Sequence, residues 1–276
     1  MSDSGRLTLV ATPIGNLGDI SPRAVQTLSE ADLIAAEDTR HTGRLLSHLG
    51  IKKPMVAYYD ANEAHRAGRI IEACLAGQAV ALVCSAGHPA ISDPGYVVVR
   101  EAVAAGVTVS VIPGPCAAVS ALSVSGLPTD AFCFHGFPPR KGPDRKALFT
   151  RISSGGTHIL YESPKRIVAT LEDIGLAADD PQVAVIRELT KKFEEVLRGS
   201  ASDVASELAS RGEVLGEIVL IVHTPTPDGA TLDAETLARI QRMQSEAGLS
   251  NKDAAKAAAA LLGISRKEIY DALAGK

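Results

Sequence analysis

Short apolar runs alternate with longer amphipathic stretches up to Ile112. Apolar runs of this length are typical of buried strands, and the stretches between them have helical spacing. Because strands alternate with helices, we expect a parallel sheet covered on both faces. The expected strands are Leu7–Ala11, Leu33–Ala36, Met55–Ala57, Ala79–Cys84 and Val107–Ile112, and the expected helices are one capped by Ser21 with Pro22 and others near Thr42–Leu49, Asn62–Ala76 and Val97–Ala105.

The pattern changes after Gly126, Leu127 and Pro128, where apolar runs follow one another with fewer helices between them. Two of these runs, Val183–Arg187 and Glu194–Leu197, are close enough in the chain to pair as a hairpin, so we expect a mixed sheet. The sequence therefore predicts an α/β protein with a parallel N-terminal sheet in residues 1–126 and a mixed C-terminal sheet in residues 127–224. The other strands expected there are Phe132–Phe134, Thr157–Tyr161 and Glu217–Val222.

The run His223–Gly229, which contains Pro and Thr, predicts a linker to a small helical appendage in residues 231–276. Within this tail, Ser250-x-x-Asp253 and Ser265-x-x-Glu268 match two successive capping boxes. Two short helices joined by a tight turn are expected. They could form a helix-turn-helix that binds nucleic acid, or a helical cap that docks on the body or takes part in a dimer contact. The sequence leaves both interpretations open.

Composition and charge narrow the class of protein. Hydrophobic residues make up 46% of the chain and charged residues 22%, as in soluble globular proteins. The start of the chain is polar and no apolar run reaches a membrane-spanning length, so we expect a cytoplasmic protein without membrane contact. The four cysteines are far apart and form no C-x-x-C pair, so no metal site is expected. The net charge of −4 argues against nucleic-acid binding, and any RNA site must be a local basic patch.

Three loops rich in Gly and Pro follow predicted strands of the first sheet: Thr12–Asp19, Ser85–Gly95 and Pro113–Ala118. In open parallel sheets, ligands bind beyond the carboxyl ends of the strands. Glycine lets the backbone approach a ligand closely, so these loops predict binding by the main chain. Common alternatives are absent, because the sequence has no G-x-G-x-x-G after the first strand, no G-x-x-x-x-G-K-S/T, no H-E-x-x-H and no G-x-S-x-G.

A set of motifs then carries a family resemblance. Over about residues 7–222, the chain closely resembles the ribosomal small-subunit RNA (cytidine-2′-O)-methyltransferases of the tetrapyrrole (corrin/porphyrin) methylase superfamily. The motifs that match are, in order, Val10–Ser21, Ala36–Arg40, Ile91–Gly95, Ile112–Pro115, Ser125–Pro128, Glu162–Pro164 and Arg187–Glu195.

The resemblance implies a two-domain methyltransferase, usually a homodimer, that holds S-adenosylmethionine between its domains. It further implies methylation of a cytidine 2′-hydroxyl in the decoding centre of 16S rRNA within the small ribosomal subunit. We predict that the cofactor touches Pro13, Ile14, Gly15, Ala86, Gly87, His88, Ile91, Cys116, Ala117 and Glu162.

Two motifs depart from the family pattern. The usual Ser-Asp-Ala-Gly-Thr-Pro is here Cys84-Ser85-Ala86-Gly87-His88-Pro89, and the usual Glu-Ser-Pro-His-Arg carries Lys165 in place of histidine. Side-chain contacts at Ser85 and His88 therefore differ from those of the family, whereas backbone contacts from Ala86 and Gly87 should remain.

Methyl transfer to a ribose needs the hydroxyl held in line with the methyl group, and a group that takes up its proton. The candidates for that group, or for orienting the nucleotide, are Asp19, Glu37, Asp38, Asp93 and Lys191. Glu37 and Asp38 follow the second predicted strand, where they could form an active-site network or cap the next helix. Asp93 precedes Pro94 and could likewise cap a helix.

Two basic clusters are candidates for RNA contact, one in the loop Arg140–Lys146 and one that brings Lys165 and Arg166 together with Arg187, Lys191 and Lys192. Solvated surface charge is the ordinary alternative. We predict RNA contacts at Arg40, Arg140, Lys141, Arg145, Lys165 and Arg166. Two other functions stay open: methylation of a tetrapyrrole, which needs an enclosed cleft and no basic rim, and a non-catalytic RNA-binding or ribosome-assembly role.

Overall fold

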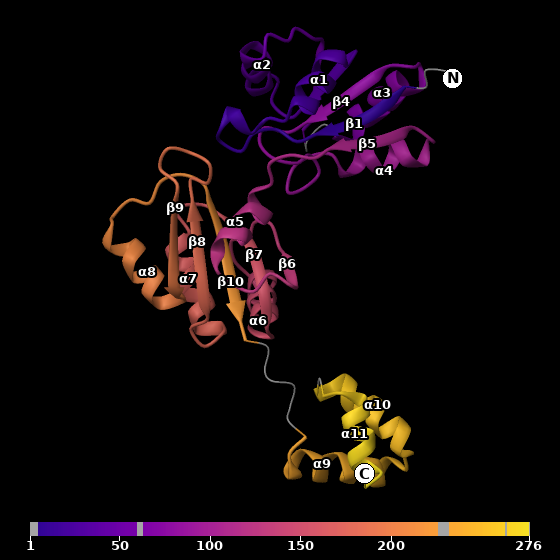
Figure 1. Ribbon diagram of the computed structural model, residues 1–276, viewed down its shortest axis with the longest axis vertical. Coiled ribbons are helices and arrows are strands. Elements are labelled where there is room, and N and C mark those ends of the chain that lie inside the picture. Colours follow the sequence, from indigo (N-terminus) through magenta and orange to yellow (C-terminus); the bar gives the residue numbers. More distant parts are fainter. Residues whose placement is uncertain (1–4, 60–62, 226–231, 263, 276) are drawn as a thin grey trace.

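The computed structural model describes residues 5–59, 63–225, 232–262 and 264–275 (Figure 1). The chain forms a first α/β domain that ends with strand β5 (Thr108–Ile112) and a second α/β domain from helix α5 (Ala117–Ser125) to strand β10 (Ile218–Thr224). A bundle of helices lies at the C-terminal end. None of the helices described is long and apolar enough to cross a membrane.

The first sheet is entirely parallel, with the strand order β3-β2-β4-β1-β5. This confirms the predicted parallel N-terminal sheet, including its weak third strand. The strands are β1 (Arg6–Val10), β2 (Leu33–Ala36), β3 (Met55–Ala57), β4 (Ala79–Val83) and β5 (Thr108–Ile112). A parallel sheet must be covered on both faces, and helices cover both faces of this one.

Each face of the first sheet has its own core. On one face, α1 (Pro22–Glu30) and α2 (Thr39–His48) bury Leu28 and Leu46 against β1, β2 and β4. On the other, α3 (Glu63–Leu75) and α4 (Tyr96–Ala104) bury Ile70 and Val98 around Tyr58. The predicted cap at Ser21 is present, since its Oγ accepts from the Ala24 amide at 3.1 Å. All four helices pack in these two cores, so both faces of the first sheet are covered.

The second sheet has the order β6-β7-β10-β8-β9, with β6 parallel to β7 and the other pairs antiparallel. This confirms the predicted mixed sheet and the hairpin of β8 with β9. Helix α5 covers one face, and α6, α7 and α8 cover the other. The elements are β6 (Phe132–Phe134), β7 (Gly156–Glu162), β8 (Gln182–Arg187), β9 (Glu195–Ser200), β10 (Ile218–Thr224), α5 (Ala117–Ser125), α6 (Pro143–Ser153), α7 (Ile167–Ala177) and α8 (Ala201–Ser210).

Helix α5 lies before the predicted domain boundary at residue 126, yet it packs on the second sheet. Its residues Ala118, Ala121 and Leu122 are buried against strands of that sheet. On the basis of packing we propose that the chain passes between the two domains in the segment Pro113–Cys116, directly after β5.

The tail forms a bundle of α9 (Ala234–Ala247), α10 (Asn251–Leu262) and α11 (Arg266–Leu273). It has its own small core, which includes Ile240, Ile264 and Ile269. One half of the first predicted capping box is present, since the Ser250 Oγ accepts from the Asp253 amide; the Ser250 hydroxyl also donates to the Asp253 carboxylate. The second predicted capping box is wrong, because Ser265 is the N-cap residue of α11 but its side chain makes no capping hydrogen bond. Gly263 and the predicted linker residues 226–229 lie outside the described residues.

Candidate active site

The three Gly- and Pro-rich loops meet at the carboxyl edge of the first sheet. Thr12 and Gly87 exchange two backbone hydrogen bonds of 2.9 and 3.1 Å, which join the loop after β1 to the loop after β4. The Thr12 hydroxyl also donates to the Cys84 carbonyl. The third loop joins through the His88 ring, whose Nε2 lies 3.3 Å from the Gly114 carbonyl oxygen. Main-chain pairing therefore joins the first two loops, and a side-chain contact from His88 adds the third to the cluster.

The loop after β4 is held in an uncommon backbone conformation. Ala90 and Ser92 have φ angles of 70° and 62°, in the left-handed region that residues with a side chain avoid. Gly95 follows at φ 146°, and a Cβ there would lie 2.9 Å from the Ala90 nitrogen. The Glu63 carboxylate fixes the end of the loop by accepting from the Gly95 amide and the Tyr58 hydroxyl, both at 2.8 Å. Such strain is typical of functional sites.

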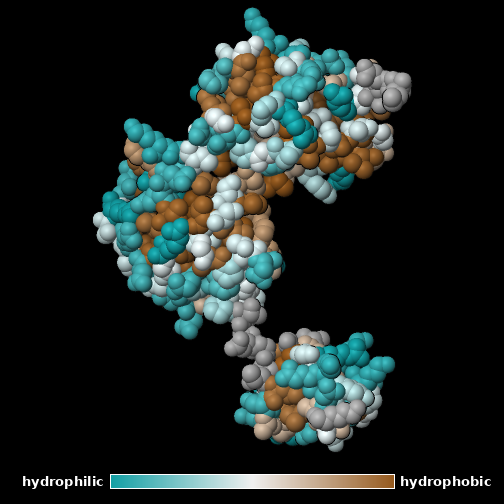
Figure 2. Space-filling view, in the orientation of Figure 1, coloured by the Kyte–Doolittle hydropathy of each residue, from teal (hydrophilic) through white to brown (hydrophobic). Residues whose placement is uncertain are grey.

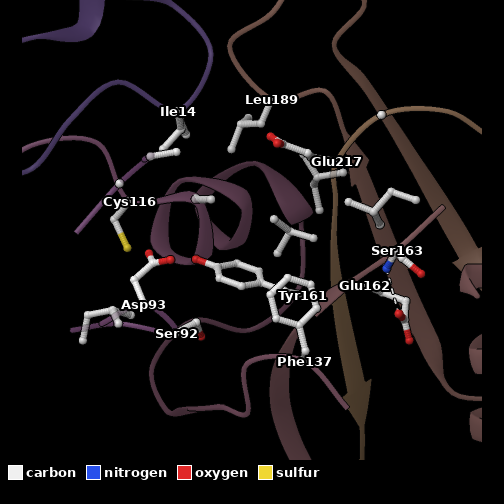
Figure 3. A pocket seen from close by; sticks show the side chains of 18 of the residues that line it. Ile14, Ser92, Asp93, Cys116, Phe137, Tyr161, Glu162, Ser163, Leu189 and Glu217 are labelled. Atoms are coloured by element: carbon white, nitrogen blue, oxygen red, sulfur yellow. Dashed lines mark hydrogen bonds between the residues drawn. The ribbon is translucent and has the colours of Figure 1, made fainter. Parts of the chain in front are cut away.

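A cleft of about 390 Å³ opens between this loop cluster and the second sheet (Figure 3). Its volume lies in the range of small-molecule sites. Eight of the predicted cofactor residues line it: Ile14, Ala86, Gly87, His88, Ile91, Cys116, Ala117 and Glu162. Pro13 and Gly15 are not among the lining residues. The space-filling view shows apolar side chains at the narrow junction between the two sheets (Figure 2).

Sequence reasoning missed most of the opposite wall. It comes from the ends of β7, β8 and β10 and from the connections beside them, and only the Glu162 motif pointed there. The missed residues of this wall are Phe137, Tyr161, Ser163, Pro164, Ile186, Leu189 and Gly216–Val219. Ser92, in the loop after β4, was missed on the near wall. The Phe137 and Tyr161 rings meet edge to face, with centroids 5.5 Å apart, and give this wall an aromatic surface.

One polar corner of the cleft combines a carboxylate, a phenol and a thiol. The Asp93 carboxylate points toward the Tyr161 hydroxyl, and the Cys116 thiol lies on the same side (Figure 3). Burial raises the pKa of Tyr161 to about 12, and the nearby thiols and Asp93 add to the shift. Burial also raises the pKa of the Cys84 thiol behind the cleft, with a contribution from Asp93. The phenol and the Cys84 thiol therefore stay protonated at neutral pH, and Asp93 is the carboxylate of this corner.

The buried carboxylate of the cleft wall, Glu162, is already engaged. Glu162 accepts from the Ser163 amide and from the Thr170 hydroxyl, each at 2.7 Å, and pairs with Arg166 at 3.2 Å. Its side chain is fully buried. Glu162 therefore fixes the end of β7 and the start of α7, and its oxygens are not free to take up a substrate proton.

An ion-pair cluster stands at the rim of the cleft. Lys191 binds Glu188 at 2.8 Å and the cleft residue Glu217 at 3.0 Å. Its stem crosses to the first domain, since a Cβ on Gly15 would lie 2.5 Å from the Lys191 Cγ. Burial alone would lower the pKa of Lys191, but the two carboxylates outweigh it and raise the pKa. The ammonium therefore stays charged and cannot act as a base.

The other predicted catalytic carboxylates lie outside the cleft lining. Asp19 is exposed at the end of the short helix η1 (Leu17–Asp19). Glu37 accepts from the Ser85 amide at 2.9 Å and so supports the loop after β4. Asp38 caps α2 by accepting from the amides of Arg40 and His41, which lower its pKa. Of the two interpretations offered for Asp38, the structure favours the helix cap.

The predicted RNA contacts divide into exposed and engaged side chains. Arg40, Arg140, Lys141 and Lys165 are exposed. Arg145 is different, because it binds Asp173 at 2.7 Å, lies over the Phe149 ring and is only 12% exposed. Arg166 binds the Pro138 carbonyl and Glu162. For Arg145 and Arg166 we therefore propose a structural role in the second domain, because the recorded hydrogen bonds and ion pairs of both side chains are with protein groups.

The family described as Tetrapyrrole (Corrin/Porphyrin) Methylases matches residues 6–205, which is most of the chain. This chain belongs to the tetrapyrrole methylase family. A relative of this methylase in Xylella fastidiosa, named Ribosomal RNA small subunit methyltransferase I, is 44% identical over 273 residues, or 98% of this chain and 99% of that protein. A relative of the same name from Halalkalibacterium halodurans is 43% identical over 277 residues, or 98% of this chain and 94% of its own.

The fold of this tetrapyrrole methylase is also found in a solved structure. Uroporphyrin-III C-methyl transferase from Thermus thermophilus, complexed with S-adenyl homocysteine, superposes with a TM-score of 0.56 at 20% identity. The match covers 79% of this chain and 97% of that one. At this identity the likeness establishes the shared fold.

The rim cluster generates a prediction on stability. In Lys191→Met, Glu188 loses the partner that holds its pKa below the ordinary 4.5. A depressed carboxylate pKa stabilises the fold above pH 4.5, and this stabilisation is lost as the pH falls through the folded-state pKa. We expect the variant to be about 1 kcal/mol less stable than wild type at pH 7, and the difference to shrink by pH 3.5, in urea unfolding. Lys192→Met, at an exposed neighbour, is the control. An equal loss of stability at both pH values would instead indicate that the alkyl chain of Lys191 stabilises the fold by packing.

Proposed function

We propose that this protein transfers a methyl group from S-adenosylmethionine to a cytidine 2′-hydroxyl of 16S rRNA, in the cytoplasm. One observation carries the RNA substrate: relatives named Ribosomal RNA small subunit methyltransferase I match this chain from end to end at 43–44% identity. Cytidine, the 2′-oxygen and the decoding centre rest on the motif resemblance.

The cleft suits the cofactor in size and in lining. Its volume of about 390 Å³ has room for a molecule of this class, and its walls are mainly apolar with a few polar groups at one corner. Gly87 lets the ligand approach the main chain, because it has no side chain and adopts a φ of 78°. The fold relative complexed with S-adenyl homocysteine supports the same assignment. When bound, the cofactor supplies the methyl group as a sulfonium.

The residues of the cleft then explain how the substrates are positioned and which group takes up the proton of the ribose hydroxyl. The paired loops at Thr12 and Gly87 fix one wall, and Glu162 fixes the other. Orientation of this kind contributes several kcal/mol to a displacement reaction. We assign the proton of the ribose hydroxyl to Asp93, because its carboxylate lines the cleft beside Tyr161 and Cys116. Asp19, Glu37 and Asp38 are not among the lining residues, and Lys191 is held as a cation.

The competing substrate is a tetrapyrrole, since the family and the solved relative act on such molecules by name. Two observations favour RNA. The relatives with high identity carry the RNA name, whereas the tetrapyrrole methyltransferase is 20% identical. In addition, exposed Lys165 follows Pro164 of the cleft lining directly, which places a basic charge at the rim. A non-catalytic RNA-binding role would leave the strained loop and the cleft without a use.

We further propose a homodimer. The edge strand β5 carries the half-exposed Val111, and the nearby helices α4 and α5 carry the exposed Tyr96 and Val119. Exposed apolar side chains along a sheet edge are commonly covered by a partner.

The proposed reaction predicts that purified protein transfers labelled methyl from S-adenosylmethionine to 16S rRNA or to small ribosomal subunits. Nuclease digestion and mass spectrometry should identify the product as 2′-O-methylcytidine. Uroporphyrinogen III, offered under the same conditions, should stay unlabelled. Label on the tetrapyrrole and none on RNA would reverse the assignment, and binding of cofactor and RNA without transfer would indicate the non-catalytic role.

Gly87→Val should weaken cofactor binding at least about tenfold, because a branched side chain would occupy the cleft wall and strain the loop. Isothermal titration calorimetry with S-adenosylmethionine measures the change. Gly106→Val is a matched control, because Gly106 has a similar φ of 74° but open space around its Cβ and lies outside the cleft. Equal affinity of Gly87→Val and wild type would refute the placement of the cofactor.

Asp93→Asn should lower kcat by about 10²- to 10⁴-fold, the usual contribution of a general base, and leave cofactor affinity near that of wild type. The amide keeps the shape of the carboxylate but takes up no proton. Single-turnover methylation measured across a range of pH gives the rate constant and shows whether it follows the ionisation of a carboxylate. Asp203→Asn, at an exposed site on α8, should behave as wild type. A variant with full kcat would exclude Asp93 as the proton acceptor.

A further inference from the structure

Residues 39–59 are unusual in an acidic protein. The segment contains four Lys or Arg and two His but no Asp or Glu, whereas the whole chain has a net charge of −4. It forms α2, the turn after it and the edge strand β3.

Packing directs the charges of α2 outward. The helix buries Thr42, Leu45 and Leu46 against the sheet. Arg40, Arg44 and His48 recur every four residues, so they share one face, and all three are exposed. The basic face therefore follows from the amphipathic pattern of the helix.

The charges continue beyond the helix into a hollow. A hollow of about 370 Å³ lies between α2 and the start of β3, and both Lys52 and Lys53 line it. Gly43 opens the hollow on the helix side, because it presents no side chain there. The surface formed by Arg40, Arg44, His48, Lys52 and Lys53 is called the α2 basic surface below.

Acidic side chains do little to neutralise this surface. Asp38 is 3.9 Å from Arg40, but the Arg40 side chain is 91% exposed, so the pair is weak. Among the described residues, no ion pair involves Arg44, Lys52 or Lys53. These three cations therefore have their charge available to a partner.

The surface starts beside the cleft and leads away from it. Helix α2 begins just after Glu37, which holds the cleft loop at Ser85. Its ten residues then span about 15 Å toward Lys52. A strand with one ribose in the cleft would meet Arg40 first and the hollow last.

We propose that the α2 basic surface binds phosphates of the substrate RNA flanking the methylated nucleotide. Cations spaced along a helix, next to a hollow lined by two lysines, match a chain of phosphates. This inference rests on the proposed function, because it assumes that RNA is the substrate.

The test compares two double variants of the full chain with equal change in charge. Arg44→Ala/Lys52→Ala removes two exposed cations of the surface, and Arg69→Ala/Arg100→Ala removes two from α3 and α4 on the opposite face of the same sheet. Binding of each to 16S rRNA made by transcription in vitro is measured from 50 to 200 mM salt. Each lost phosphate contact lowers the log–log salt slope by about 0.7–0.9, so between these salt concentrations wild type should lose about tenfold more affinity than the first variant.

Methylation assays complete the test. We expect the first variant to raise KM for RNA, with cofactor affinity and kcat at saturating RNA near wild type, and the second variant to match wild type throughout. If wild type neither binds nor methylates RNA, the proposed function fails. If wild type methylates RNA and the first variant keeps its salt slope and KM, this surface is overturned and the function stands. Loss of binding to assembled subunits alone, with naked RNA unaffected, would also overturn it in favour of a protein contact.

Discussion

The pair of backbone hydrogen bonds between Thr12 and Gly87 is the constraint on which the cleft depends. These bonds join loops that follow strands β1 and β4, which are neighbours in the sheet although Thr12 and Gly87 are 75 positions apart in the chain. Because main-chain groups make the bonds, the joint does not depend on which side chains occupy the loops. It therefore survives the departure of this chain from its family at Ser85 and His88, and His88 even adds a contact to Gly114.

The two domains contribute different kinds of chemistry to the cleft. The first supplies backbone, small side chains and Asp93, as expected for a site at the carboxyl edge of a parallel sheet. The second supplies the aromatic wall of Phe137 and Tyr161 and the rim cation Lys191. Carboxylates that look alike in the sequence are separated by their surroundings: Glu162 is fully engaged, Asp38 caps a helix, and Asp93 faces the cleft.

The sequence was sufficient for the two sheets and for one wall of the site. Parallel strands bring their carboxyl ends to one edge, so the three Gly- and Pro-rich loops could be placed together from the alternation of strands and helices. The family resemblance then singled out Ile14, Gly87 and Cys116 within these loops. Tyr161 could not be placed in this way, because its position follows from the packing of a second sheet against the loops. The ion pair of Arg145 could not be predicted for a related reason, since its partner Asp173 lies on another helix and only the tertiary fold joins them. The ambiguity at Asp38 is intrinsic, because a helix cap and a catalytic acid have the same local pattern.

The segment Pro113–Cys116 has a consequence for how the molecule moves. Along the described residues, it is the passage that we propose between the two α/β domains, and its two prolines have fixed φ angles. Gly114 is wedged against Ala11, where a Cβ would lie 2.9 Å from the Ala11 side chain. We expect a connecting segment that is both stiff and packed to resist rotation of one α/β domain against the other. We therefore expect entry and release of small molecules to depend on side chains at the rim, whose rotamer changes are orders of magnitude faster than hinge motions of whole domains.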